Sequence, residues 1–178
     1  MSKSLGNFFT VREISEKYDL QVLRFFMLSA HYRSPLNFSA ELMEAAGSGL
    51  ERIVNAAENL KFLASKAKTE EMTEAEKETF AKTDEFVKGF EAAMEDDFNT
   101  ADAIASVFEL VKFANTNTDE NNSAEYLKEM RARLVKLTDV LGIIVEKKEE
   151  ILDSDIEAMI KERQAARKAK DFARADEI

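Results

Sequence analysis

Residues 39–64 read SAELMEAAGSGLERIVNAAENLKFLA, and this stretch decides the fold. Apolar residues recur in it at steps of three and four, the spacing of one face of an α-helix: Leu42, Ala46, Leu50, Ile53, Ala57 and Leu60. Ser39 precedes the pattern and predicts the helix start, because its hydroxyl can accept a hydrogen bond from a first-turn amide. The stretch therefore predicts one helix to about residue 64, roughly 38 Å long at about 1.5 Å per residue. Gly47 and Gly49 within it indicate close approach by another helix, an interpretation that we favour over a local weak point.

Two shorter helices are predicted before the long one. Thr10 and Glu13 have the spacing of a capping box, in which each side chain bonds the backbone amide of the other residue, and they predict a helix over 11–17. A second helix over about 20–30 is ended by Pro35. Its expected buried stripe is Leu23, Phe26, Met27 and Ala30.

Three further apolar stripes predict helices after the long one. They are Phe86, Phe90, Ala93 and Met94; Ile104, Val107, Phe108 and Val111; and Tyr126, Met130, Leu134, Leu137 and Leu141. Their start signals are a Thr73–Glu76 capping box, Asn99 or Thr100, and Ser123. Residues 115–122 are expected to form a polar loop. Gly142 is expected to end the last of these helices, because glycine readily adopts the left-handed conformation that often follows a helix.

The composition supports the same fold class. The chain has 178 residues, of which 5 are Gly and 1 is Pro, while 45% are hydrophobic and 34% are charged. Few helix breakers and many charges are typical of helical proteins. We therefore predict an all-α fold, an antiparallel bundle of about four long helices with a two-helix piece before it and a basic helix after it. The expected domains are residues 1–38, the bundle at 39–145, and a linker with the basic helix at 146–178.

Charge is distributed unevenly along the chain. The formal net charge is −10, which by itself argues against a nucleic-acid partner. Residues 67–97 hold four lysines against eleven acids, whereas residues 161–174 hold six basic residues against two acids. The basic side chains are Lys161, Arg163, Arg167, Lys168, Lys170 and Arg174. This segment is either a solvated amphipathic helix that rests on the bundle or, as we favour, a surface that docks against phosphates.

The residue types present exclude several kinds of site. The chain has no Cys and one His, so disulfides and a conventional zinc site are excluded and no metal site is expected. No apolar run approaches the roughly 18 residues that span a bilayer. These features fit a cytoplasmic protein that has no membrane partner.

Most of the single side chains that could take part in catalysis or binding have a structural explanation. His31 is expected to anchor a turn, and Arg24 to pair with Asp19 one helical turn away. We interpret Asp96 and Asp97 as acids at a helix start, because neighbouring residues on a helix point in different directions. The phenylalanines at 86, 90, 98 and 108 are expected in the core rather than as a stacking platform for bases.

The chain begins with Met1-Ser2-Lys3-Ser4, followed by Leu-Gly-Asn. A lysine between two serines, with a glycine nearby, is typical of a loop that holds phosphate, because it combines a mobile cation, short hydroxyls and accessible backbone. The loop resembles the nucleotide loop of class I aminoacyl-tRNA synthetases. The segments at 7–10, 18–19, 22–26, 31–39, 94–100 and 163–176 extend this similarity, and together they resemble cysteinyl-tRNA synthetases.

The resemblance implies a tRNA-binding, C-terminal part of such an enzyme, truncated at both ends, with an anticodon-binding bundle. It implies that Lys3, in a loop with Met1, Ser2 and Ser4, contacts ATP phosphates and stabilises adenylation. It also implies that Arg33 and the basic residues of 161–174 contact tRNA. The implied partners are tRNA for cysteine, ATP and L-cysteine, with zinc in a missing catalytic domain. Because the family's His-x-Gly-His pattern is absent, we expect no adenylation activity from this chain alone.

Two other interpretations stay open. One is the corresponding part of a cysteine ligase of mycothiol biosynthesis, which shares the loop but joins cysteine to an amino sugar and binds no tRNA. The other is a stand-alone helical scaffold without chemistry. The match over residues 31–39 and the basic tail favour the tRNA-binding interpretation.

Overall fold

The computed structural model describes residues 10–146, 160–164, 167 and 174, and the chain divides into two compact units, residues 1–146 and 147–178. Every regular element among the described residues is helical, which confirms the all-α prediction. The helices of the first unit are α1 (Val11–Ser15), α2 (Leu20–Leu28), α3 (Ala40–Lys66), α4 (Glu74–Ala81), α5 (Asp84–Glu95), α6 (Thr100–Asn117) and α7 (Ala124–Val140).

The starts of α1, α3, α4, α6 and α7 lie where the sequence places them, whereas α5 begins after an unpredicted break at Thr83, which makes no side-chain cap hydrogen bond. Thr10 with Glu13 and Thr73 with Glu76 form complete capping boxes at α1 and α4. The side chains of Ser39, Asn99 and Ser123 accept hydrogen bonds from first-turn amides of α3, α6 and α7. Each such cap contributes about 1 kcal/mol to stability. The starts of these helices are therefore fixed by local chemistry.

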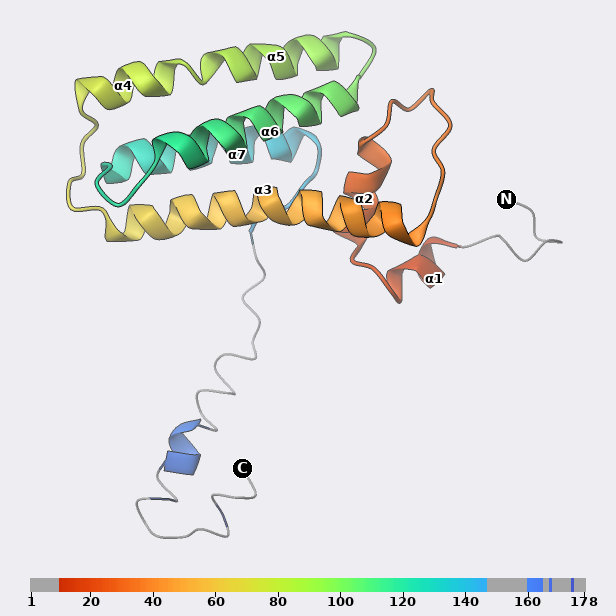
Figure 1. Ribbon diagram of the computed structural model, residues 1–178, viewed down its shortest axis with the longest axis horizontal. Helices are drawn as coiled ribbons and strands as arrows, with labels where there is room; N and C mark the ends of the chain where they lie inside the picture. The colour runs from red at the N-terminus through yellow and green to blue at the C-terminus, as the bar shows by residue number, and fades with distance from the viewer. Residues whose placement is uncertain (1–9, 147–159, 165–166, 168–173, 175–178) are drawn as a thin grey trace, which may run out of the picture. The chain divides into compact units, whose positions relative to one another are not determined.

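Helix α3 runs along one side of the bundle, with α2 across one end and with α6 and α7 lying along it (Figure 1). Its buried face includes Met43, Leu50, Ile53 and Leu60. Leu42, expected on that face, is 45% exposed, because the core-facing stripe enters the first turn one residue later, at Met43. The predicted close approach occurs at Gly49, where a Cβ would lie 3.0 Å from Cε1 of Phe25 on α2.

Helix α2 departs from its predicted stripe. It ends at Leu28, before Ala30, and it buries Phe25 and Phe26. Met27 is 59% exposed. The Phe25 ring forms a T-shaped contact with Phe108 on α6, with the ring centroids 6.2 Å apart. The buried face of α2 therefore includes Phe25 in place of Met27. α2 is thus part of the same core as α3 and α6.

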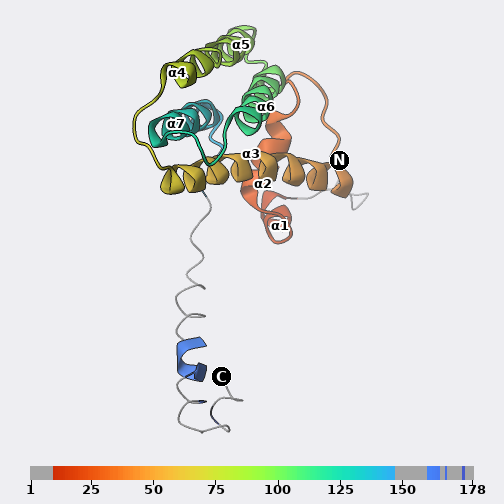
Figure 2. The same cartoon turned by 60° about the vertical axis from the view of Figure 1, so that its left-hand side comes forward.

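Helices α4 and α5 follow one another on the outer side of α6 and α7 (Figure 2). Thr83 lies at the break between them and is fully buried. The Arg133 guanidinium of α7 donates to Thr83 and Asp84 and lies 4.2 Å from the Phe80 ring centroid. This one side chain fastens both outer helices to α7.

Glu76 joins the start of α4 to the start of α7. Its carboxylate accepts hydrogen bonds from the amide of Thr73, the amide and hydroxyl of Ser123, and the side-chain amide of Asn122. Partial burial acts to raise the pKa of Glu76, but these donors outweigh it and hold the pKa at about 2. We refer to Glu76, Thr73, Asn122 and Ser123 as the Glu76 clip.

The end of the first unit returns to its beginning. Gly142 has φ of +65° and follows α7 as the sequence predicts. Ile143 and Val145 are buried, and the amide of Ile144 donates to Oε1 of Gln21 on α2 over 3.1 Å. The short apolar segment after α7 therefore closes the core against the second helix of the chain.

Helix α6 is longer than the sequence predicts, because residues 115–117 are helical rather than part of a loop. The hydroxyl of Thr116 donates to the carbonyl of Lys112, and the Asn117 amide donates to the carbonyl of Phe113. These side chains satisfy carbonyls at the end of the helix, so turn-forming residues extend it. None of the described helices is both long and apolar enough to cross a membrane.

Candidate nucleic-acid interface

The nucleotide loop predicted from Met1, Ser2, Lys3 and Ser4 lies outside the described residues. Its role in holding ATP phosphates therefore stays a prediction. The described chain begins at Thr10, the N-cap of α1. Residues 10–48 connect that point to the first turns of α3 through α1 and α2.

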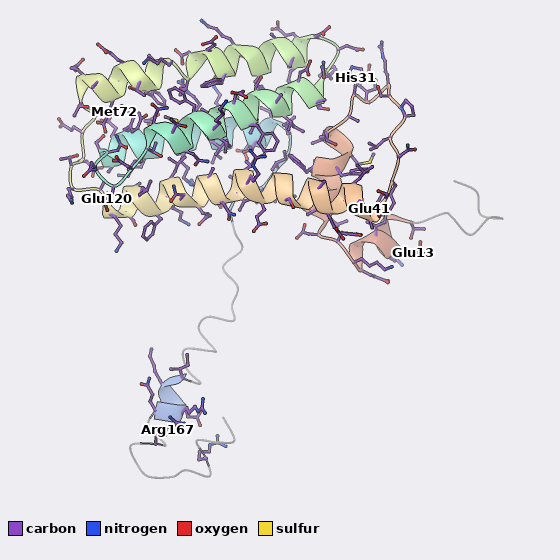
Figure 3. The ribbon with its side chains drawn as sticks, viewed as in Figure 1. Glu13, His31, Glu41, Met72, Glu120 and Arg167 are labelled. Carbon is purple, nitrogen blue, oxygen red and sulfur yellow. The ribbon has the colours of Figure 1, made fainter. Side chains whose placement is uncertain are left out.

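Arg33, predicted to contact tRNA, lies in a cluster with His31, Tyr32 and Asp97, which we call the Asp97 cluster. Figure 3 shows His31 in the loop between α2 and α3, near the α5–α6 corner. The Arg33 Nη1 atom lies 3.0 Å from Asp97 Oδ2, and the Tyr32 hydroxyl donates to Asp97 Oδ1 over 2.8 Å. The His31 ring stacks on Tyr32 at 4.8 Å. The cluster joins segments 65 residues apart in the sequence.

The cluster compensates the charge of Arg33 but leaves the side chain 68% exposed. The hydrogen bond to the Asp97 carboxylate raises the pKa of Tyr32 above its ordinary value, because the ionised phenol could not donate it. Arg33 Nε also donates to the Tyr32 hydroxyl over 3.0 Å. An incoming phosphate would have to compete with Asp97 for this guanidinium.

Asp97 and Phe98 form a tight corner between α5 and α6, with φ values of 55° and 54°. The left-handed conformation costs a residue other than glycine roughly 1 kcal/mol or more. Opposing contacts hold the corner: Asp97 lies against Arg33 and Tyr32, and the Thr100 hydroxyl donates to the carbonyl of Leu28. The expected placement of Asp96 and Asp97 at a helix start is wrong, since Asn99 caps α6 and Asp96 follows the end of α5.

The corner also changes the expected role of one phenylalanine. Phe98, predicted in the core, is 65% exposed, because the left-handed backbone turns its side chain outward. Phe90 is buried, and Phe86 and Phe108 are half-buried against the core as expected. The α5–α6 corner therefore presents an aromatic ring to solvent.

Arg24 does not pair with Asp19 in the described part of the chain. The Asp19 side chain instead caps α2 by accepting from the amide of Gln21. The Arg24 guanidinium lies beside Gly142, where an added Cβ would come 2.6 Å from Nη1. The competing helix cap explains why spacing alone gave the wrong partner.

The predicted basic tail is described in part, within the second unit. Lys161 and Arg163 lie in the helical residues 160–164, and Arg167 and Arg174 are also helical. Arg174 pairs with Glu162 at 3.0 Å. Lys168 and Lys170 lie outside the described residues. Four of the six predicted cations are thus placed on helical backbone.

A polar groove that the sequence did not single out runs between α3 and α6, with a volume of about 490 Å³. We call it the α3–α6 groove. It is lined by Arg52, Asn55, Ala56, Asn59, Val111, Lys112, Asn115 and Thr116. A stripe of Arg52, Asn55 and Asn59 at helical spacing was the available signal, but only the pairing of α3 with α6 shows which residues face it.

Two domain families match the chain. The profile of the DALR domain matches residues 89–146, which comprise the second half of α5, α6, α7 and the segment that follows. The profile described as the tRNA synthetases class I (C) catalytic domain matches residues 1–48, which end in the first turns of α3. In the sequence, one match covers the beginning of the first unit and the other covers its end.

Relatives are similar to the chain over all of its residues. A cysteine–tRNA ligase of Lachnospira eligens is 61% identical over 178 residues, and the chain covers 38% of that relative. Ligases of the same name from Lachnoclostridium phytofermentans and Clostridioides difficile are 53% and 51% identical over the whole chain, which covers 39% and 38% of them. The chain is therefore similar over its whole length to cysteine–tRNA ligases, and it spans less than two fifths of the length of these relatives.

Proposed function

We propose that this chain is the tRNA-binding part of a ligase that attaches L-cysteine to its tRNA at the expense of ATP. The observation that carries the proposal is similarity over every residue of the chain to proteins named cysteine–tRNA ligase, with a DALR domain on its bundle. DALR domains bind the anticodon region of tRNA. The bundle would hold the anticodon end, and residues 1–38 would join it to the catalytic domain.

Lys3 is the residue proposed for the reaction itself. Adenylation releases pyrophosphate, and negative charge grows on the departing phosphates as the bond breaks. An ammonium group held beside them stabilises that charge more in the transition state than in the bound substrate, which lowers the barrier. Ser2 and Ser4 would hold the loop against ATP through their hydroxyls. This role follows from the resemblance of residues 1–7.

The proposed tRNA contacts are Arg33 and the basic residues of the second unit. Helices α4 and α5, which hold most acids of residues 67–97, are unsuited to a polyanion. RNA would therefore approach the first unit away from the exposed acids of these helices and would meet α5 only at the Asp97 cluster beyond its end. Lys161, Arg163, Arg167, Lys168, Lys170 and Arg174 would contact phosphates, while Arg33 would exchange Asp97 for a phosphate.

Zinc, if the ligase uses it, would be held by residues outside this chain. The sequence has no Cys and one His, and the described residues contain no group of three or more His, Asp or Glu side chains able to hold a metal ion. The donors that zinc prefers are thus missing here. The similarity to cysteine–tRNA ligases is also the ground on which we propose a cytoplasmic location.

The mycothiol alternative gains no support from the relatives, because proteins 48–61% identical over the whole chain carry the name cysteine–tRNA ligase. The scaffold interpretation leaves the match to a class I catalytic profile over residues 1–48 without an explanation. We therefore keep the tRNA-binding proposal alone.

Titration of the chain with a transcript of tRNA for cysteine, at several salt concentrations, tests the proposal. We expect binding whose log K falls with log salt by about 0.7–0.9 for each phosphate contacted, and weaker binding of an unrelated tRNA. The double change Arg163→Gln and Arg167→Gln should weaken binding, whereas Lys77→Gln should not, since Lys77 is on α4 and pairs with Glu74 at 2.8 Å. Failure to bind any tRNA would contradict the proposal.

A further inference from the structure

The α3–α6 groove has an unusual lining for so acidic a chain. Its eight lining residues include two cations, three asparagines and one threonine, and none is an acid, although the sequence has 35 Asp and Glu. Ala56 and Val111, both 3% exposed, form its floor. A surface that concentrates donors and leaves out carboxylates is suited to a negatively charged or polar ligand.

The three asparagines of the groove have unused hydrogen-bonding capacity. Within the described chain, the side-chain amides of Asn55, Asn59 and Asn115 form no hydrogen bond with another residue. Asn99, Asn117 and Asn122, in contrast, all use their amides to cap or join helices. Each free carboxamide offers both donors and an acceptor. Three side-chain amides without a structural task thus lie together in this groove.

The two cations at the groove are held differently, Arg52 by an aromatic ring and Lys112 only by a weak ion pair. The Arg52 guanidinium lies 4.9 Å from the Phe108 ring centroid, and this stacking leaves the N–H groups at its edge able to donate. Lys112 approaches Glu109 only to 3.8 Å, with both side chains mostly exposed. Such an exposed pair is weak, so a phosphate can displace Glu109.

We infer that the α3–α6 groove holds a short stretch of a tRNA strand, with Arg52 and Lys112 on phosphates and the asparagines on ribose hydroxyls or base edges. This inference rests on the proposed function and deepens it. Arg52 and Asn59 are seven residues apart on α3, about 10 Å along the helix. That length is enough for a short stretch of strand to contact cations and amides along the groove. Amides that both donate and accept match the 2′-hydroxyl and base edges of RNA.

A protein partner fits the groove less well. Stable protein interfaces are anchored by large apolar or aromatic side chains in desolvated pockets. The floor here offers only Ala56 and Val111, and the exposed Phe62 of α3 is not among the lining residues. The chemistry of the lining therefore favours RNA.

Charge-removing variants give the first test, on the full chain with the tRNA transcript. Arg52→Gln and Lys112→Gln should each raise Kd about fivefold at 0.1 M salt and make the salt slope shallower by about 0.7–0.9. Lys88→Gln on α5 removes the same charge outside the groove and should change neither quantity. Circular dichroism melts of the variants show that the fold is kept.

Amide-removing variants give an independent readout. Asn59→Ala and Asn55→Ala should raise Kd severalfold while leaving the salt slope unchanged, because a neutral side chain releases no counterion. Asn121→Ala, in the loop between α6 and α7, is the matched control. A phosphate-only surface would not separate affinity from salt slope in this way.

The absence of cysteine from the sequence allows the position of the RNA to be mapped directly. A cleavage reagent attached to Asn59→Cys should cut the bound tRNA at one localised site, whereas the same reagent on Lys88→Cys should not. If wild type binds tRNA but groove variants keep its Kd and Asn59→Cys gives no localised cut, the groove inference is overturned and the proposed function stands. If wild type binds no tRNA, both are overturned.

Discussion

Three described residues adopt the left-handed conformation, for two different reasons. Gly142 does so because it ends α7, a local task that the sequence signals. Asp97 and Phe98 do so because the α5–α6 corner is held by Tyr32, Arg33 and the carbonyl of Leu28, all far away in the sequence. The first could be predicted from the chain alone. The second could not, because the restraint is long-range.

Gly142→Ala should lower the free energy of unfolding by about 1–2 kcal/mol. Alanine is strained at positive φ, and its Cβ would displace the Arg24 guanidinium, which lies 2.6 Å from that position. Gly47→Ala is the matched control, since its Cβ would meet Val22 at 3.7 Å in a helix. That change should stabilise the fold by about 0.5–1 kcal/mol. Urea denaturation of both variants measures the opposite signs.

At the scale of elements, the starts of α1, α3, α4, α6 and α7 could be predicted, whereas the end of α6 could not. Ser39, Asn99, Ser123 and the two capping boxes act within four residues, so the sequence contains the whole interaction. The end of α6 depends on side chains that bond carbonyls one turn back, a use of Thr116 and Asn117 that competes with turn formation. Leu42 was placed in the core wrongly for another reason: the apolar spacing of α3 does not decide whether Leu42 or Met43 is the first residue to face the core.

The Glu76 clip predicts a specific loss of stability in acid. The carboxylate has a pKa of about 2 in the folded chain, below its ordinary value of 4.5. Its contribution is therefore complete above pH 4.5 and is lost as the pH falls toward 2. Glu76→Gln should lower the free energy of unfolding by about 1–2 kcal/mol at pH 7 and by much less at pH 3.

Urea denaturation at the two pH values checks this difference between wild type and Glu76→Gln. Glu78→Gln, an exposed neighbour on the same helix, should leave the pH dependence as in wild type. An equal deficit of Glu76→Gln at both pH values would show that the clip does not depend on its charge.

At the scale of the molecule, most acids of residues 67–97 lie on α4 and α5, whereas no acid lines the α3–α6 groove. The net charge of −10 could not reveal the α3–α6 groove. Its Asn residues carry no charge, and its two cations, Arg52 and Lys112, are 60 residues apart in the sequence. The groove exists only when α3 and α6 lie side by side. The resemblance to cysteinyl-tRNA synthetases, in contrast, could be recognised from short segments, and comparison over all 178 residues confirms it.

Removal of residues 147–178 should separate stability from RNA binding. Among the described residues, the buried hydrophobic cluster lies within residues 25–145, so residues 1–146 should melt within a few degrees of the full chain. The tRNA affinity should fall, with a shallower salt slope, because the six cations of 161–174 are removed. Differential scanning calorimetry and the salt titration measure the two effects separately. A large drop in melting temperature would show that the second unit completes the core.

The hydrogen bond from Ile144 to Gln21 gives the first unit a seam between positions 123 residues apart. Arg24 beside Gly142 belongs to the same seam. Tension applied to the two ends of this unit would load the seam before it reached any interior helix. Mechanical rupture should therefore start where the ends meet, and optical-tweezer traces should show α2 peeling from residues 142–144 ahead of α3, α6 and α7.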